Sequence, residues 1–217
     1  MAVLAYCITE TQPEITVPQA GVCGAAIRTV RVEDLQCFAS QFGPQDVVGK
    51  APIQEAALDF NRVLQDLLRQ IAVVPFRFPT MLTDETAVSQ FLIEHQSEYR
   101  GTLHRLRNCV QMEILLKMPT SKQPQAASPK SGAEYLRGRQ AQHQYIESIV
   151  ARFREAADPL AKQWRHRETV AGIRCFALVD KNDVQVFLRQ MKDVSVPTES
   201  EPRVTGPWPA SEFLKEQ

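Results

Sequence analysis

A stretch of fourteen residues without a large apolar side chain divides this sequence into two parts. The stretch runs from Pro119 to Gly132 and holds three prolines and three serines. Such a composition buries too little apolar surface to offset the entropy that a chain loses on ordering, and it is typical of linkers. We therefore expect two domains, over residues 1–118 and 133–217, with a linker over residues 119–132 between them.

The composition of the whole chain is that of a folded protein. Hydrophobic residues make up 44% and charged residues 23% of the 217 residues, which excludes collagenous and wholly disordered chains. Lysine and arginine together number 25, as do aspartate and glutamate, so the formal net charge is zero. A neutral chain is not expected to hold nucleic acid by bulk charge.

Membrane, secretory and metal-bound classes are also disfavoured. No segment approaches the roughly 18 consecutive apolar residues of a membrane span, and the first eight residues lack the basic group of a secretory signal. The five cysteines show no C-x-x-C spacing, and no Cys/His cluster occurs, so neither a zinc site nor a disulfide framework is indicated. We expect no cofactor, and we expect most cysteines to be small buried hydrophobes in a reducing cytosol.

Hydrophobic periodicity predicts interspersed strands and helices in the N-terminal part. One apolar stripe marks a helix from about Pro52 to Ile71. A second stripe marks a helix that Thr83 or Asp84 can cap and that reaches to about Arg107. Residues 73–82 are extended, but they contain two prolines that cannot donate to a strand ladder, which favours an edge strand or a bulge. Further strands are predicted over Val3–Ile8, Ala25–Val32 and Cys109–Met118. Leu35–Phe42 is also interpreted as a strand, with one helical turn as the alternative.

The C-terminal part begins with a long helix. Its apolar stripe runs from Ala133 to Pro159, where the pair Asp158-Pro159 indicates a kink or a restart. The basic residues around Trp164 are interpreted as a solvated helix face rather than a phosphate-binding surface, because the net charge is zero. The remaining predicted elements are a strand over Val170–Val179, a helix opened by the capping pair Asp180 and Asp183, and a strand over Val204–Pro207.

Two charged residues in predicted strands are candidates for a specific contact. Arg77 lies between two phenylalanines and Glu113 lies between Met112 and Ile114, so each charge points away from the apolar face of its strand. If the strands are neighbours, the charges form a cross-strand or partly buried ion pair, which we predict; the alternative is two independent surface charges.

His95 is the histidine best placed for a chemical role. It lies on the apolar stripe of its helix between Phe91 and Tyr99, with Glu98 three residues further on. A metal site in a helical layer needs several converging ligands, so a buried or rim histidine is the favoured interpretation. No P-loop, G-x-G-x-x-G, G-x-S-x-G or H-E-x-x-H motif occurs.

A series of short motifs resembles, in order and over nearly the whole chain, the gas vesicle protein F/L family. The matching segments are Val74-Pro-Phe-Arg-Phe78, Glu113-Ile-Leu-Leu-Lys117, Ser131-Gly-Ala-Glu-Tyr-Leu-Arg-Gly-Arg139, Ala177-Leu-Val-Asp180 and Gly206-Pro-Trp-Pro209. The resemblance implies structural or interaction roles for Pro75, Arg77, Phe78, Glu113, Lys117, Tyr135, Leu136, Arg139, Asp180, Gly206, Pro207, Trp208 and Pro209.

The same resemblance implies a fold and a function. The fold is α+β in two domains, the first ferredoxin-like and the second a modified ferredoxin-like fold with a long helix. The implied function is that of a non-enzymatic accessory or minor structural protein of gas vesicle formation. Such a protein binds the small hydrophobic shell protein, and other accessory proteins, during nucleation or assembly. It resides at the gas vesicle, and in the cytoplasm during assembly, with neither nucleic acid nor a lipid membrane as partner.

Two other functional classes stay open at this point. In a ligand-binding or enzymatic ferredoxin-like domain, Arg77 holds an anion while Glu113 or His95 moves a proton, which requires the three side chains to converge in one cleft. An RNA-binding sheet requires exposed aromatic residues on its central strands, and the strand Val3–Ile8 offers only Tyr6.

The C-terminal Gly206-Pro-Trp-Pro209 segment is predicted to dock on its own chain. Two prolines restrict the backbone on either side of Trp208, so placing the indole costs little entropy. The alternative is that Trp208 anchors a partner protein, since tryptophan is enriched at interface hot spots.

Overall fold

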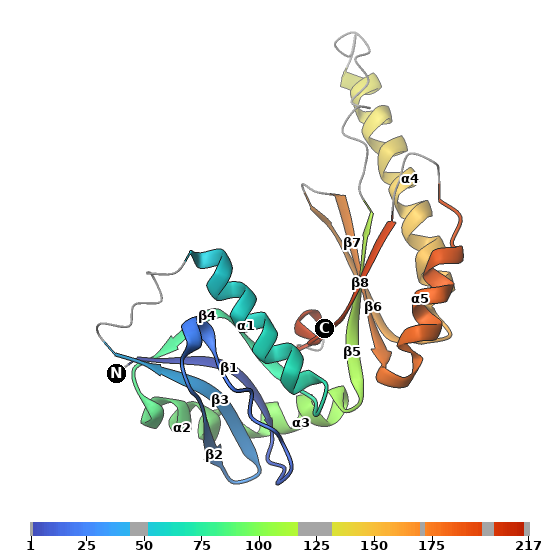
Figure 1. The fold of residues 1–217 in the computed structure, drawn as a ribbon. Helices are drawn as coiled ribbons and strands as arrows, with labels where there is room; N and C mark the ends of the chain where they lie inside the picture. The colour runs from blue at the N-terminus through green and yellow to red at the C-terminus, as the bar shows by residue number, and fades with distance from the viewer. Residues whose placement is uncertain (1, 44–51, 117–131, 170–171, 197–201, 215–217) are drawn as a thin grey trace. The chain divides into compact units, whose positions relative to one another are not determined.

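The computed structural model describes residues 2–43, 52–116, 132–169, 172–196 and 202–214, without the side chains of residues 132–135, 138, 139, 141 and 142. These residues form two compact units (Figure 1). Unit 1 comprises Met1–Val110 and Trp208–Gln217, and unit 2 comprises Gln111–Pro207.

Unit 1 is built on a four-stranded antiparallel sheet with the strand order β2-β3-β1-β4. The strands are β1 (Ala2–Glu10), β2 (Ile27–Val32), β3 (Leu35–Phe42) and β4 (Val74–Leu82). The proline-containing strand β4 lies at the edge of the sheet, as its sequence predicted.

Helices cover both faces of this sheet. Every residue of β1 from Val3 to Thr9 is buried, and neighbouring strand residues point to opposite faces, so both faces of β1 are shielded from solvent. Helix α1 (Ile53–Leu68) lies on one side of the sheet, and α2 (Glu85–Glu94) and α3 (Gln96–Leu106) lie on the other (Figure 1). Most of the stripe predicted for α1 is buried, whereas Ala57 is half-buried and Ile53 is 70% exposed.

The single helix predicted over residues 84–107 is in fact two helices. Of the two candidate caps, Thr83 and Asp84, it is Asp84 that caps α2, because its carboxylate accepts the backbone N–H of Ala87 at 2.8 Å. His95 separates α2 from α3, with backbone angles of φ −111° and ψ 13°. The ring Nδ1 of His95 lies 3.0 Å from the carbonyl oxygen of Phe91, which also accepts the backbone N–H of His95. A side chain that competes for a carbonyl of the helical ladder is a recognised cause of such a break.

Unit 2 contains the second four-stranded sheet, with the order β6-β7-β5-β8. Its strands are β5 (Cys109–Leu116), β6 (Ala161–Thr169), β7 (Gly172–Asp180) and β8 (Pro202–Trp208). Helices α4 (Gly132–Ala157) and α5 (Val184–Asp193) lie on the same side of this sheet (Figure 1). The two helices contribute to the core the apolar side chains of Ile146, Ile149, Val150, Phe153, Ala157, Val184, Phe187 and Met191.

Residues 161–169 form strand β6, and their interpretation as a helix face is wrong. Trp164 and His166 alternate with Arg165 and Arg167, a period of two, and β6 pairs antiparallel with β7. The helix before them ends at Ala157 rather than restarting after the proline. Strand β6 lies at the edge of its sheet, and edge strands often carry charged residues. Because charged residues lie on both faces of β6, its sequence does not alternate between apolar and polar residues.

The α+β class is confirmed, but the sheets divide the chain differently from its composition. The predicted N-terminal domain included β5, which lies between β7 and β8 in the sheet of unit 2. The last ten residues, by contrast, belong to unit 1. The linker predicted over residues 119–132 lies, apart from Gly132, outside the described residues, and it stays a prediction.

Candidate interaction sites

A four-residue bulge on the edge strand β4 presents Arg77. Along the β1–β4 ladder, Ala5 faces Thr80 and Cys7 faces Pro75. One residue of β1 therefore opposes the four residues of β4 from Phe76 to Pro79, and the hydroxyl of Thr80 donates to the carbonyl of Arg77 at 2.6 Å across the bulge.

Aromatic contacts on both sides hold this bulge in place. The ring of Phe76 lies 5.6 Å from that of Phe91 on α2, and the ring of Phe78 lies 5.1 Å from that of Phe60 on α1. Arg77 is exposed between these two anchored rings, and Pro75 is half-buried at the start of the bulge. The motif around Arg77 therefore shapes an edge of the sheet and presents one cation to solvent.

Tyr6 is the residue of β1 that opposes the bulge, and it fastens the long β1–β2 connection to the core. Its phenol oxygen lies 3.0 Å from the hydroxyl of Ser40 and accepts the backbone N–H of Val22 at 2.8 Å. Burial raises the pKa of this phenol, so it stays neutral. The sequence offered no signal for this network beyond an aromatic residue in a strand.

Glu113 forms an ion pair, but its partner is Arg174. The Nε and Nη2 atoms of Arg174 donate to the two carboxylate oxygens of Glu113 at 2.7 and 2.8 Å, from the neighbouring strand β7. Arg77 belongs to the sheet of unit 1, so the predicted pair between Arg77 and Glu113 is wrong. Phe76 and Phe78 pack on helices at opposite sides of the sheet, so β4 does not have the single apolar face that was expected. Even a correct phase does not identify the neighbouring strand.

His95 and Glu113 belong to different units. The ring of His95 stacks on that of Phe91 at 4.4 Å in unit 1, whereas Glu113 is engaged by Arg174 in unit 2. Neither unit therefore assembles the trio of Arg77, Glu113 and His95 that the enzymatic interpretation requires. Within the described part of the chain, no three His, Cys, Asp or Glu side chains are grouped as they would be around a metal ion.

The first half of α4 carries a family-like motif and buries no described side chain. Leu136 is 67% exposed and Tyr145 is 42% exposed, and the first buried residue of the helix is Ile146. The motif residues Tyr135 and Arg139 lie on the same stretch, with side chains outside the description, and Lys117 lies outside the described residues. Leu136 and Tyr145 are therefore side chains that this half of the helix leaves in contact with solvent.

Asp180 has a local structural role. One carboxylate oxygen accepts the backbone N–H of Asn182 at 3.0 Å, and the other lies 3.3 Å from the ammonium of Lys162 on β6. Asp180 therefore caps the turn between β7 and α5, as the capping prediction implied for this position.

The C-terminal motif forces a close approach of two strands and then leaves the sheet. Gly206 has φ 126°, and a Cβ atom there would lie 2.9 Å from both the carbonyl oxygen of Gln111 and the sulfur of Met112. Pro207 is exposed, Trp208 is half-buried and Pro209 is buried.

The buried ring of the C-terminal segment is Phe213 rather than Trp208. Phe213 is fully buried, and Ala210 is 2% exposed. The guanidinium of Arg105, on α3, donates to the carbonyl oxygens of Phe213 at 2.8 Å and Leu214 at 3.1 Å. The ring of Phe213 and the main chain thus help to hold the segment, and nothing in the sequence pointed to Arg105 as their partner.

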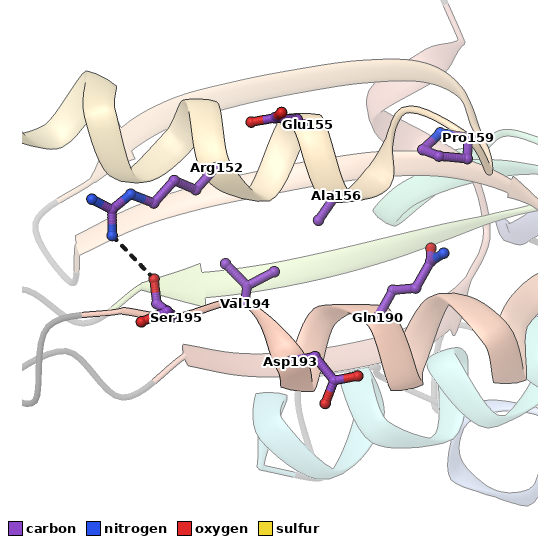
Figure 2. Close-up of a pocket in the computed structure, with 8 residues that line it drawn as sticks. All are labelled: Arg152, Glu155, Ala156, Pro159, Gln190, Asp193, Val194 and Ser195. Carbon is purple, nitrogen blue, oxygen red and sulfur yellow. Dashed lines mark hydrogen bonds between the residues drawn. The ribbon is translucent and has the colours of Figure 1, made fainter.

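An open hollow of about 640 Å³ lies between α4 and α5 in unit 2. Figure 2 shows its lining, where Arg152 donates to the carbonyl of Ser195 at 3.3 Å. Glu155 and Asp193 add two carboxylates, and the side-chain oxygen of Gln190 is buried without a hydrogen-bond partner among the described residues. None of the residues predicted from the motifs lines this hollow.

These features define a class of protein before they define a family. Each unit is a sheet supported by helices, and the motif residues that are described shape strand edges, turns and exposed surfaces. Among the described residues, no helix combines the length and the apolar character needed to cross a membrane. The class is a two-unit α+β protein in which several of the described motif residues shape strand edges and turns.

Comparison with known proteins identifies the particular family. A family model described as gas vesicle synthesis protein GvpL/GvpF matches residues 2–215, so the chain belongs to this family of gas vesicle assembly accessory proteins. No curated protein matches the chain in sequence.

Two solved structures share the fold over the full length. The gas vesicle protein GvpF from Anabaena sp. PCC7120 superposes with a TM-score of 0.82 at 14% identity, covering 100% of this chain and 97% of its own. GvpF from Microcystis aeruginosa superposes with a TM-score of 0.81 at 13% identity, covering 99% of each chain. At such low identity these similarities concern the fold alone.

Proposed function

We propose that this protein is a non-enzymatic accessory protein of gas vesicle formation that binds the small hydrophobic shell protein during nucleation or assembly. The observation that carries the proposal is the family match, which extends over residues 2–215. Other accessory proteins of the vesicle are further partners. The protein acts in the cytoplasm and at the gas vesicle while the vesicle assembles.

The surface proposed for the shell protein is the first half of α4. It presents Leu136 at 67% exposure, and its described side chains as far as Tyr145 are all exposed. A hydrophobic partner gains free energy by covering such positions, at about 25 cal/mol per Å² of apolar surface removed from water. The basic side chain of Arg137 beside Leu136 adds attraction for an acidic group on the partner.

A capture experiment with a matched control tests this assignment. Leu136→Glu is compared with Leu58→Glu on α1, because the two leucines are equally exposed, at 67% and 69%. The purified full-length variants are mixed with shell protein and recovered by an affinity tag. We expect Leu136→Glu to lose capture of the shell protein and Leu58→Glu to retain it. If both variants still capture the shell protein, the binding surface is not the first half of α4. If the unmodified chain does not capture it, the proposed function is overturned.

The finer description of the fold is also proposed here. We infer that both units are variants of the ferredoxin-like arrangement. In support, unit 2 runs strand, helix, strand, strand, helix, strand along the chain, which is the element order of that fold. Unit 1 has the equivalent strand order, with the connection over residues 11–26 and its short 3-10 turn Val22–Gly24 where the first helix of that order would stand.

A further inference from the structure

The C-terminal segment is attached to one unit and packed in the other. Strand β8 is hydrogen-bonded into the sheet of unit 2, yet the residues from Trp208 onward belong to unit 1. The change occurs between Pro207 and Trp208. A segment placed in this way is a separate packing element joined to the rest of the chain by a short tether.

The place on unit 1 that receives this segment has the character of a peptide-binding site. Phe213 supplies a fully buried ring, and Arg105 recognises two successive main-chain carbonyls. Within the segment, the N–H of Ser211 bonds the carbonyl of Pro209 at 2.7 Å, and the N–H of Phe213 bonds that of Ala210 at 3.0 Å. The segment therefore arrives as a compact turn with its own hydrogen bonds, which lowers the entropy lost on binding.

We propose that the seat around Arg105 also accepts the C-terminal segment of a second copy of this chain, which gives a dimer by exchange of residues 209–214. Exchange is open to an element that packs as a unit at the end of a tether, because every contact made within one chain is reproduced between two. Phe213 of one copy then fills the seat of the other, and its carbonyls receive the guanidinium of the other copy's Arg105.

The tether decides which form is populated. Within one chain the segment is held near its seat at an effective concentration on the order of 1 mM, as for other short tethers. Exchange competes only when the concentration of chains approaches that value, or when chains are refolded together. The prolines at 207 and 209 restrict the tether, so few conformations are gained when the segment leaves its own seat.

Two full-length variants with complementary defects test the exchange. Phe213→Ala has an intact seat and a defective segment, whereas Arg105→Ala has an intact segment and a defective seat. Each is refolded alone and in an equimolar mixture at high protein concentration, and the species are separated by size and weighed by native mass spectrometry. We expect the mixture to contain a mixed dimer, in at least tenfold excess over dimers of either variant alone, because only the mixture offers an intact segment to an intact seat.

Controls and contrary outcomes are well defined. Ser211→Ala, at an exposed position of the segment, and Arg69→Ala, at an exposed position at the end of α1, should behave as the unmodified chain does. If Phe213→Ala fails to fold, Phe213→Leu is substituted, since it shortens the ring while keeping an apolar side chain. The proposal would be overturned if the refolded mixture contained only monomers. It would also be overturned if Phe213→Ala alone formed dimers as readily as the mixture does.

Discussion

Several side chains and one glycine make contacts that cannot be predicted from the neighbouring residues in the sequence. Tyr6 is one example: it lies in strand β1, and its phenol oxygen accepts the backbone N–H of Val22 in the connection between β1 and β2. The sequence placed Tyr6 in an apolar strand, and in the structure its side chain is fully buried. No period predicts which hydroxyl or N–H its phenol meets, since these partners lie 34 and 16 residues away.

Gly21 is expected to tolerate no side chain. A Cβ atom at this position would overlap the phenol oxygen of Tyr6 and lie 2.7 Å from the hydroxyl of Ser40. Gly21→Ala should therefore displace the Tyr6 hydroxyl and lower the free energy of unfolding by about 1–3 kcal/mol, the usual cost of overpacking. Chemical denaturation measures this difference. Gly101→Ala is the control, because a Cβ there meets no atom within 4 Å; equal stability of both variants would contradict the expectation.

The contact between Asp34 and Arg100 makes a small part of the stability depend on pH. The guanidinium of Arg100 donates hydrogen bonds to the Asp34 carboxylate at 2.8 Å and holds its pKa below the ordinary value of 3.8. A carboxylate with a lowered pKa stabilises the fold above its ordinary pKa, and this contribution is lost as the pH falls through the folded value. Because the pair is exposed, the effect is small.

Asp34→Asn should thus lower the melting temperature slightly at pH 7 and should not lower it once the pH is below the folded pKa. Thermal melts of both chains from pH 7 to pH 2 measure the difference. A gap between the two melting temperatures that stays constant over this range would show that the carboxylate charge does not contribute.

At the scale of elements, apolar periodicity predicted helix α1, which has one apolar face. The same reasoning failed for strand β6. Helix α1 begins one residue after its predicted start. Strand β3 has the predicted bounds, although its sequence also allowed one helical turn. Strand β6 carries charged residues on both faces, so its period of two did not stand out. The break at His95 depends on a side-chain contact with a carbonyl, which a hydropathy pattern does not contain.

The C-terminal segment should depend more on Phe213 than on Trp208. Phe213 is fully buried whereas Trp208 is half-buried, so removal of the smaller ring leaves the larger cavity. Phe213→Ala should lower the free energy of unfolding by about 3–5 kcal/mol, and Trp208→Ala by less. Denaturant titrations of the two variants rank them, and a greater loss for Trp208→Ala would restore the original assignment of Trp208 as the docking residue.

At the scale of the whole molecule, the mixture of strands and helices was predictable but the allocation of strands to sheets was not. Composition placed a boundary at residues 119–132, whereas the sheets place β5 with the strands that follow that stretch. The pairing of strands depends on long-range contacts, for which a single sequence carries no direct signal. The same limit explains why Glu113 was assigned the wrong partner.

Cleavage within residues 119–132 should leave the fragments associated. The composition of this stretch predicts protease sensitivity, with fragments near 13 and 10 kDa at roughly 110 Da per residue. Strand β5, on the N-terminal fragment, is hydrogen-bonded between β7 and β8 on the C-terminal fragment. The nicked protein should therefore elute as one species in native buffer and as two bands in denaturant. If the first cuts fall elsewhere and this stretch resists the protease, the predicted linker is wrong. If the two fragments separate in native buffer, the role of β5 is contradicted.

The division of the chain also sets an order for its biosynthesis. Unit 1 holds both the beginning and the end of the sequence, so unit 2 is an insertion within it. A ribosome delivers residues in sequence, and a domain closes only when its last element has emerged. Unit 2 is contiguous and is complete once Pro207 has emerged, whereas unit 1 waits for Phe213. The unit that is started first is thus finished after the unit inserted in it, and a chain released between Pro207 and Phe213 would leave the seat around Arg105 unfilled.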